Sequence, residues 1–440
     1  MIEFIHQTTW DDLPTAVQHQ ARRCLLDTLG AAVGGRQTEL SRIIHEFAAA
    51  VYGGVGTQLW QDGRSVSSPG AAPANGMTID ALDIHDGYNL VKGHIGAAIV
   101  PAALASLTGD RSVSGKELLT RLVVGYEVAA RAGIVLHETV CDYHTSGAWN
   151  ALGAAAVSAR HLRLTPEQTR HALGIAEYHG PRSQMMRCIE FPTMVKDGSG
   201  WGAMSGVSAA MLAANGFTGA PAVTIEADDV QSHWVDLDEK WHILDQYFKP
   251  HAVCRWAQPA IAGVLALRQQ HNFQPEAVQT IRVHTFHEAV CLTTRRPQTT
   301  EAAQYSLPFP VAAALVKNQL GPAELSGAAL AHPLILQLAD RVELVEDEVY
   351  NGRFPAQRFA RVEIILTDGT SLQSDAHQPG WDADAPPTDV ELRQKFRWLA
   401  GGLLAAERVM EIEKAVWQLP DLAPGGSGTF RLYPSPAPLP

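Results

Sequence analysis

The sequence predicts a mainly α-helical protein, with a large all-helical domain and a smaller α+β domain. Two observations support this fold class. Apolar residues recur at helical spacing through the first 260 residues, with almost no alternation of period two. Alternating stretches typical of strands begin after about residue 275, and a helical pattern returns near the C-terminus. We therefore expect helices packed on helices, together with one small sheet that forms late in the chain.

Helices of the first part are predicted from apolar spacing and from capping signals. Residues 15–33 carry apolar residues at helical spacing, and Gly34-Gly35 is expected to end that helix. Ser114–Glu117 and Thr165–Gln168 have the form of capping boxes, which predicts a helix start at each. Residues 151–159 are mostly Ala, Gly and Val. Such small side chains let neighbouring helices approach closely.

Strands are predicted in the last third of the chain. Residues 280–286 alternate around Ile281 and Val283, and residues 362–366 alternate before Asp368-Gly369, a pair that favours a hairpin turn. Residues 341–345 form a weaker third strand candidate. These three stretches indicate a small sheet.

Apolar helices are expected between and after these strands. They cover about residues 304–318 and 327–339, and a third capping box at Thr388–Glu391 starts a last helix. This last helix is expected to dock on the first domain. The tail that ends in PSPAPLP is too rich in proline to fold.

Length, charge and cysteine content limit the classes of function. A chain of 440 residues is long enough for two domains with sizeable cores. Its formal net charge of −12 argues against nucleic acid or an anionic membrane as the main partner, although a cleft can still attract a small anion. The five cysteines contain no CxxC pair, as expected for a reduced protein. We see no signal peptide and no apolar run long enough to span a bilayer, so a cytoplasmic protein is predicted.

One stretch, residues 74–107, concentrates polar groups and then becomes apolar. This arrangement indicates a site at the entrance of a helix, the alternative being a solvated loop that precedes a core helix. The polar residues of the stretch are Asp83, His85, Asp86, Tyr88, Lys92 and His94.

Metal and nucleotide sites are not expected. Four of these residues (Asp83, His85, Asp86 and His94) are metal ligands by type, but their spacing matches no standard site. The glycine-rich segment 196–206 matches neither the P-loop nor the dinucleotide-binding pattern. The sequence therefore predicts an enzyme without cofactor or metal.

Isolated cationic or proton-carrying side chains lie in runs of small residues, which leave room for a ligand. Taken alone, a residue of this kind is more often a surface residue or a satisfied core residue than a site residue. Together they are what removal of a proton α to a carboxylate requires, because nearby cations stabilise the carbanion while a His or Lys takes the proton. These residues are His94, His144, Lys196, Lys249 and His251.

Successive blocks along nearly the whole chain resemble the MmgE/PrpD family, which includes 2-methylcitrate dehydratase, cis-aconitate decarboxylase and iminodisuccinate epimerase. The blocks are ANGMTIDALDIHDG, GHIGAAIVPAALA, YHTSGAWNALGAAAVSAR, MVKDGSGWGAMSGVSAAMLAANGFTGAP, YFKPHAVCRWAQPAI, AQYSLPFPVA and KFRWLA. The resemblance implies a homodimer and cofactor-free chemistry on a small di- or tricarboxylate. It also implies a helical domain built from both chain ends, here residues 1–268 and 396–440, and an α+β lid domain, residues 269–395.

The resemblance also implies roles for single residues. It places the site carboxylate at Asp83 and the proton-transfer histidine at His94, with His144 and Lys196 as further catalytic residues. Lys249 corresponds to the substrate-binding lysine of the second domain. The other substrate-binding candidates are Tyr88 in the polar stretch, His251 beside Lys249, and Cys254 and Phe309 in the later blocks.

The chain departs from the decarboxylase-like members at three places. Cys254 stands where they have His, Phe309 stands where they have Tyr, and Asp197-Gly198-Ser199 replaces a stretch that ends in Leu-His. Efficient decarboxylation of cis-aconitate is therefore not expected. The sequence favours a lyase of the dehydratase type, with an epimerase of an imino- or amino-dicarboxylate as the alternative. A metal-dependent hydrolase and a non-catalytic helical scaffold are the remaining readings.

Overall fold

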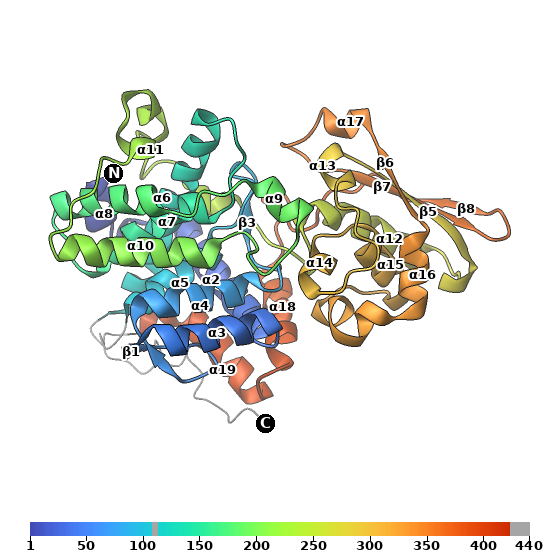
Figure 1. Ribbon diagram of the computed structural model, residues 1–440, viewed down its shortest axis with the longest axis horizontal. Helices are drawn as coiled ribbons and strands as arrows, with labels where there is room; N and C mark the ends of the chain where they lie inside the picture. Colours follow the sequence, from blue (N-terminus) through green and yellow to red (C-terminus); the bar gives the residue numbers. More distant parts are fainter. Residues whose placement is uncertain (108–112, 423–440) are drawn as a thin grey trace.

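The computed structural model describes residues 1–107 and 113–422. Figure 1 shows the helices of the first half and the C-terminal α18 and α19 on one side of the molecule, and the larger sheet with α12 to α17 on the other. The predicted mainly-α fold class is confirmed. Within the described residues no helix combines the length and the apolar character needed to cross a membrane. The predicted cytoplasmic location stays a prediction.

The α-helices fall into three groups along the chain. The first group is α1 (Ile2–Gln7), α2 (Thr15–Gly35), α3 (Glu39–Val51), α4 (Ser68–Asp80), α5 (Gly96–Ser106), α6 (Gly115–Thr139), α7 (Gly147–His161), α8 (Pro166–His179), α9 (Met185–Glu190), α10 (Ser199–Ala214) and α11 (Val223–Glu226). The second group is α12 (Gln258–Gln270), α13 (His287–Val290), α14 (Thr300–Gln304), α15 (Pro308–Lys317), α16 (Pro333–Asp340) and α17 (Glu348–Asn351). The last two are α18 (Asp389–Gly401) and α19 (Ala406–Trp417).

Small residues set the distances between the helices of the first group. Helix α2 continues through the glycine pair to Gly35. The predicted helix is thus two residues too short. A Cβ atom on Gly35 would lie 2.0 Å from the carbonyl oxygen of Thr78, so only glycine lets α2 approach α4 this closely. A Cβ on Gly206 would lie 2.4 Å from the carbonyl oxygen of Ala151, where α10 packs against α7. This confirms the expected close approach at residues 151–159.

Two of the three predicted capping boxes form completely. Those at Thr165–Gln168 and Thr388–Glu391 have both reciprocal hydrogen bonds. Ser114 accepts the backbone N–H of Glu117, but the Glu117 carboxylate binds Arg121 and Arg160 instead of the cap. Salt bridges to two arginines therefore replace the second half of that box.

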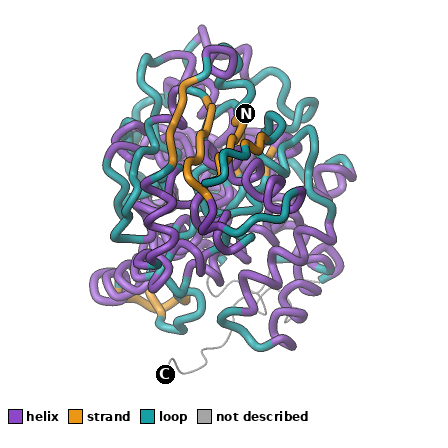
Figure 2. The backbone as a smooth tube through the Cα atoms, turned by 90° about the vertical axis from the view of Figure 1, so that its right-hand side faces the viewer, coloured by secondary structure: helices purple, strands orange, loops and turns teal. Residues whose placement is uncertain are grey.

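The larger sheet has four strands in the order β6-β5-β7-β8. They are β5 (Val278–Thr285), β6 (Val342–Glu346), β7 (Ala360–Leu366) and β8 (Ser371–Gln373). Strand β6 runs parallel to β5, whereas β7 is antiparallel to both β5 and β8. Gly369, at φ +88°, makes the predicted hairpin turn between β7 and β8. All three predicted strands are confirmed, and Figure 2 looks onto the side of the molecule on which this sheet lies.

The apolar segments between these strands are helical, but each helix starts later than predicted. The segment 304–318 forms α15 from Pro308 onward, and α14 precedes it. The second begins as a 3₁₀ turn at Gly327–Ala331, and α16 starts only at Pro333, where proline at the first helical position fits.

Two further pairs of strands lie in the first part, where helices alone were expected. Strand β1 (Gly53–Gln58) pairs with β2 (Ser65–Val66), and β3 (Gly87–Tyr88) pairs with β4 (Gln246–Tyr247). Strand β1 has six residues, three of them glycine, and the other three strands have two residues each, so none of them produces an alternating apolar pattern. The β3–β4 pair joins the polar stretch of the sequence to the segment that carries Lys249.

Both predicted domain boundaries fall inside helices. Residue 268 lies in α12, which packs against α15 and β7 beside the larger sheet. Residue 396 lies in α18, which packs against α2. The division into a helical domain and a lid stays a prediction. The proline-rich tail lies outside the described residues.

Candidate active site

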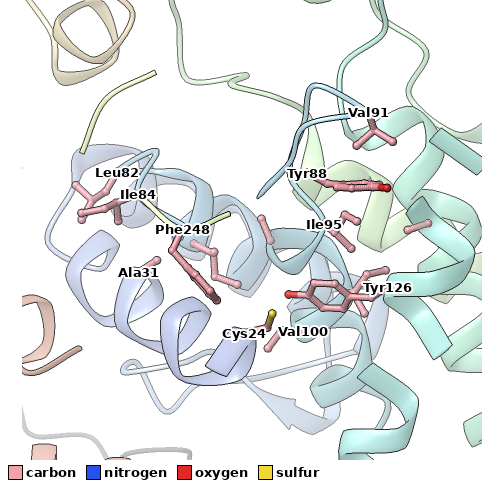
Figure 3. Close-up of a cluster of buried hydrophobic side chains, with 14 of the residues drawn as sticks. Cys24, Ala31, Leu82, Ile84, Tyr88, Val91, Ile95, Val100, Tyr126 and Phe248 are labelled. Carbon is pink, nitrogen blue, oxygen red and sulfur yellow. The ribbon is translucent and has the colours of Figure 1, made fainter. Parts of the chain in front are cut away.

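The polar stretch forms a buried loop, residues 81–95, between α4 and α5. Leu82, Ile84 and Ile95 of this loop pack into the hydrophobic core together with Phe248 (Figure 3). Only 1% of Asp83 and 8% of His94 are exposed. The alternative of a solvated loop is therefore wrong.

Asp83 lies at the centre of a group of charges. Lys249 Nζ donates to Asp83 Oδ1 at 2.7 Å and to the Asp83 carbonyl oxygen at 2.9 Å. His94 Nε2 lies 3.6 Å from the same Oδ1 atom. Burial alone would raise the pKa of Asp83, but Lys249 and Lys196 together lower it below its ordinary value. Asp83 is therefore a carboxylate at neutral pH.

The orientation of His94 determines which ring nitrogen carries the proton. Its Nδ1 lies 2.7 Å from the carbonyl oxygen of Asp86, and because a carbonyl oxygen only accepts, Nδ1 must be the donor. Burial, followed by Lys249, lowers the pKa of His94 to about 3, so the ring is neutral near pH 7. Ser146 and Asn150 fix the His94 backbone through hydrogen bonds of 2.8 and 2.7 Å. The lone pair of Nε2 is therefore free to accept a proton.

Lys196 is held by the C-terminal end of α14 and the residue that follows it. Its ammonium group donates to Gln304 Oε1 and lies 4.8 Å from the ring centroid of Tyr305. Gln304 in turn donates from Nε2 to the carbonyl oxygen of Ala81, at 3.0 Å. The Gln304 amide thus connects Lys196 to the start of the 81–95 loop.

Two further buried carboxyl groups lie behind this lysine. Burial, together with the neighbouring Asp80, raises the pKa of Asp197 to about 8, and burial raises the pKa of Asp80 to about 6. Ser146 donates to Asp197 from its hydroxyl and, at 3.0 Å, from its backbone N–H. Because Ser146 also binds the His94 N–H, a protonated Asp197 lies two hydrogen bonds from His94.

A small cavity of about 20 Å³ adjoins Asp83 and His94, which is room for about one water molecule. Of its lining residues, only Asp83, His94 and Cys254 are predicted from the sequence to be site residues. The others are Lys92, Tyr143, Met185, Tyr247, Arg255, Trp256, Tyr305 and Arg358.

Some of the lining residues that were not predicted could have been found from their position in the sequence, and others could not. Lys92 belongs to the polar stretch and Arg255 follows Cys254 directly, so position in the chain could have suggested both. Arg255 stacks over Tyr247 at 3.9 Å and forms an ion pair with Asp382 at 2.8 Å. Arg358 precedes β7 in a segment without a motif, and no sequence pattern connects it to the site.

Six predicted site residues lie outside the lining of this cavity. Two of them, Lys196 and Lys249, are the lysines near Asp83 described above, and the other four lie elsewhere. Tyr88 binds His242 through its hydroxyl at 2.6 Å, and His251 Nδ1 lies 3.0 Å from the carbonyl oxygen of Leu320. Phe309 is fully buried in α15. His144 Nδ1 lies 2.8 Å from the carbonyl oxygen of Asp142. Their catalytic and substrate-binding roles stay predictions.

The described residues contain no group of three or more His, Cys, Asp or Glu side chains disposed to hold a metal ion. The donor set around the cavity instead consists of cations, phenols and one imidazole. Such a set suits an anionic ligand with several carboxylate oxygens.

Comparison with known proteins gives matches along almost the entire chain. The sequence model of the MmgE/PrpD N-terminal domain matches residues 1–243, and that of the MmgE/PrpD C-terminal domain matches residues 251–419.

Curated relatives are distant in identity but similar in length. A cis-aconitate decarboxylase of Homo sapiens is 24% identical to this protein, in an alignment that covers 95% of this chain and 90% of the relative's chain. A cis-aconitate decarboxylase of Aspergillus terreus is 22% identical, over 93% of this chain and 90% of its own. The cis-aconitate decarboxylase-like protein oryM of Aspergillus oryzae is 24% identical, over 93% and 91%.

Proposed function

The chain belongs to the MmgE/PrpD family, and from this premise we propose that it is a cofactor-independent lyase acting on a small di- or tricarboxylic acid. In the proposed reaction the enzyme removes a proton α to a carboxylate and then eliminates a β-hydroxyl group as water. The relatives named as cis-aconitate decarboxylases support the lyase class, since a decarboxylase is a carboxy-lyase.

The observation that carries the proposal is the neutral imidazole of His94 beside two ammonium groups. His94 Nε2 takes the α-proton, and the electron pair left on carbon spreads into the adjacent carboxylate. Lys249 has three N–H donors and uses two of them on Asp83, which leaves one for this developing charge. Positioned cations of this kind stabilise a carbanion most effectively where water is excluded, as at this buried loop.

Dehydration follows when the electron pair forms the carbon–carbon double bond and the β-hydroxyl leaves with a proton. The imidazolium of His94 holds that proton after the first step, and the phenols of Tyr143, Tyr247 and Tyr305 line the same cavity as further donors. The reaction consumes no oxidant or reductant.

Decarboxylation is the second candidate, because the curated relatives carry that name. The carbanion left when CO₂ departs would then take its proton from a phenol of the cavity, which regains it from solvent, because Nε2 of the neutral His94 carries none. Of the two residues that differ from the decarboxylase-like members, Cys254 lines the cavity. Phe309 is buried in α15 and does not line the cavity, so it can affect the cavity only through packing. Cys254 is a weak donor, which favours dehydration over decarboxylation.

A substrate of four to seven carbons exceeds the small cavity, so binding requires the surrounding segments to separate. The cavity wall combines the 81–95 loop and α9 with residues 247–256, 305 and 358. We expect substrate access between these segments, as in the predicted arrangement of helical domain and lid.

The homodimer is also part of the proposal. Apolar side chains are exposed on α10 and directly after it, at Trp201, Met211, Leu212 and Phe217. Clustered exposed apolar residues are typical of a protein–protein interface. Sedimentation equilibrium should show a dimer, and a monomer at micromolar concentration would contradict this part alone.

Solvent exchange tests the proposed chemistry most directly. A panel of hydroxy- and amino-substituted di- and tricarboxylates is incubated with the protein in D₂O and followed by NMR for deuterium uptake, loss of water and loss of CO₂. We expect α-deuterium uptake with loss of water. Exchange without elimination would indicate an epimerase, and no exchange with any acid would contradict the proposal.

A further inference from the structure

Two cations on the cavity wall have no role in the reaction described above. Lys92 belongs to the 81–95 loop, and Arg358 precedes β7 on the sheet side of the molecule. Both line the cavity that Asp83 and His94 line. Burial, followed by the charge of Arg358, lowers the pKa of Lys92, and burial together with Arg358 lowers that of Arg255, as expected when like charges lie close together.

The protein gives this pair no close counter-charge, since Glu288 affects the pKa of Lys92 less than burial and Arg358 do. Only 3% of Arg358 is exposed, its Nη1 donates to the amide oxygen of Asn89 at 2.9 Å, and its Nε is buried without a hydrogen-bond partner. Lys92 is half-buried, with its ammonium 4.8 Å from the ring centroid of Tyr143. In the part of the chain described, neither side chain forms an ion pair with an Asp or Glu, whereas Arg255 beside them is paired with Asp382.

An unpaired guanidinium buried beside an ammonium is unfavourable unless a ligand supplies the missing charge. The backbone of Lys92 has a φ of +51°, in the left-handed region that a lysine rarely adopts. Such unfavourable conformations are concentrated at ligand-binding sites, which agrees with a binding role for Lys92. Asn89, which positions Arg358, is itself fixed by donating to Asp382 at 2.7 Å. Arg358 is thus held in place through Asn89 and Asp382.

We propose that Lys92 and Arg358 form a second carboxylate subsite, which binds the carboxylate of the substrate farther from the reacting carbon and selects dicarboxylates over monocarboxylates. The proposal deepens the proposed function and rests on it for the identity of the ligand. The guanidinium of Arg358 offers its Nε–H and a neighbouring N–H as a fork that matches a carboxylate. Lys92, in the 81–95 loop, adds a point charge to the same cavity.

Equilibrium binding tests this subsite without turnover. Isothermal titration calorimetry of the full chain compares succinate, malonate and glutarate with butyrate, which has the carbon count of succinate but one carboxylate. We expect the best dicarboxylate to bind at least tenfold more tightly than butyrate. Arg358→Gln should weaken dicarboxylate binding by about tenfold to a hundredfold and change butyrate binding less than twofold. Arg353→Gln, an exposed arginine five residues away, is the matched control and should change neither.

A second variant tests the subsite independently if Arg358→Gln does not fold. Lys92→Gln removes a half-buried charge without a hydrogen-bond partner and should show the same selective weakening. Equal affinity of the unsubstituted protein for dicarboxylates and butyrate would overturn the subsite. So would a folded Arg358→Gln variant that binds dicarboxylates normally or loses both ligands equally. The exchange experiment above reads out the chemistry separately, so selective binding without α-deuterium uptake would overturn only the proposed function.

Discussion

Lys249 and Asp83, separated by 166 positions in the chain, form a fully buried ion pair in which the ammonium also binds the backbone of its partner. Asp83 has a φ of +50°, so its backbone is held in the left-handed region at the point where Lys249 binds. The pair therefore orients the carboxylate toward His94 and connects the 81–95 loop to the segment after β4. This arrangement leads to the following predictions.

Replacing Lys249 with Met should destabilise the protein by about 3–5 kcal/mol, because it leaves the carboxylate of Asp83 buried without its partner. Adding Asp83→Asn should restore part of the loss, since the unpaired charge is then removed. Urea unfolding of the two single variants and the double variant measures this coupling. Simple additivity of the two single effects would show that the pair is not coupled.

His94→Asn should lower kcat by about 10²–10⁴, the range for loss of a general acid–base group. The Asn side chain is polar like imidazole, so we expect the melting temperature to change little. Steady-state kinetics and a thermal melt check both parts. His287→Asn is the control, because His287 is exposed on α13 and should leave kcat unchanged. Near-normal turnover of the His94 variant would mean that another residue is the base.

The free energy of unfolding of the Asp197→Asn variant, minus that of the unsubstituted protein, should increase as the pH rises from 4 to 8. The folded pKa of Asp197 is raised to about 8, whereas its unfolded value is about 3.9. The folded state therefore binds the extra proton between these values, and this contribution to stability, complete below pH 4, is lost as the pH rises to 8. Asn has no proton to lose. Urea unfolding at pH 5 and pH 8 tests this, and a stability difference independent of pH would contradict it.

Lys395→Met should loosen the 81–95 loop although Lys395 does not line the cavity. From α18, its ammonium donates to Asp27 Oδ1 and to the carbonyl oxygen of Ile84, both at 2.6 Å. Losing these bonds leaves the loop with one anchor fewer, so hydrogen exchange of peptides covering residues 81–95 should accelerate and kcat should fall. Arg397→Met, on the exposed side of the same helix, should leave exchange in that loop unchanged. Equal exchange in both variants would argue against the positioning role.

Itaconate should form from cis-aconitate only slowly. Cys254 is the weak donor on the cavity wall where the resembling decarboxylases have His, and a lost hydrogen bond to a charged group costs about 1.5–3 kcal/mol. Itaconate production at an ordinary enzymatic rate, measured by NMR, would falsify this prediction. Cys254→His is the informative variant, because it should raise the rate if the donor alone is missing.

Local sequence signals predicted the elements and the loop that carries the site. The capping boxes at Thr165 and Thr388 and the alternation in β5 and β7 act within a few residues, so they can be recognised without the fold. The polar stretch around Asp83 and His94 was identified in the same way. The starts of α15 at Pro308 and of α16 at Pro333 were missed, because the apolar character of both segments begins several residues earlier.

By itself the sequence determined the helical class, the three strands of the sheet and, through the resemblance, the family. Only the tertiary structure decided that Lys249 neutralises Asp83, that Lys92 and Arg358 share a cavity wall, and that Tyr88 and Phe309 lie outside its lining. The physical reason is that these contacts join side chains on different segments of the chain. Their formation depends on helix crossings and strand pairing, such as that of β3 with β4, which no local pattern encodes. Charge pairing across such distances in the chain follows from packing, and so do the pKa of Asp197 and the neutral state of His94.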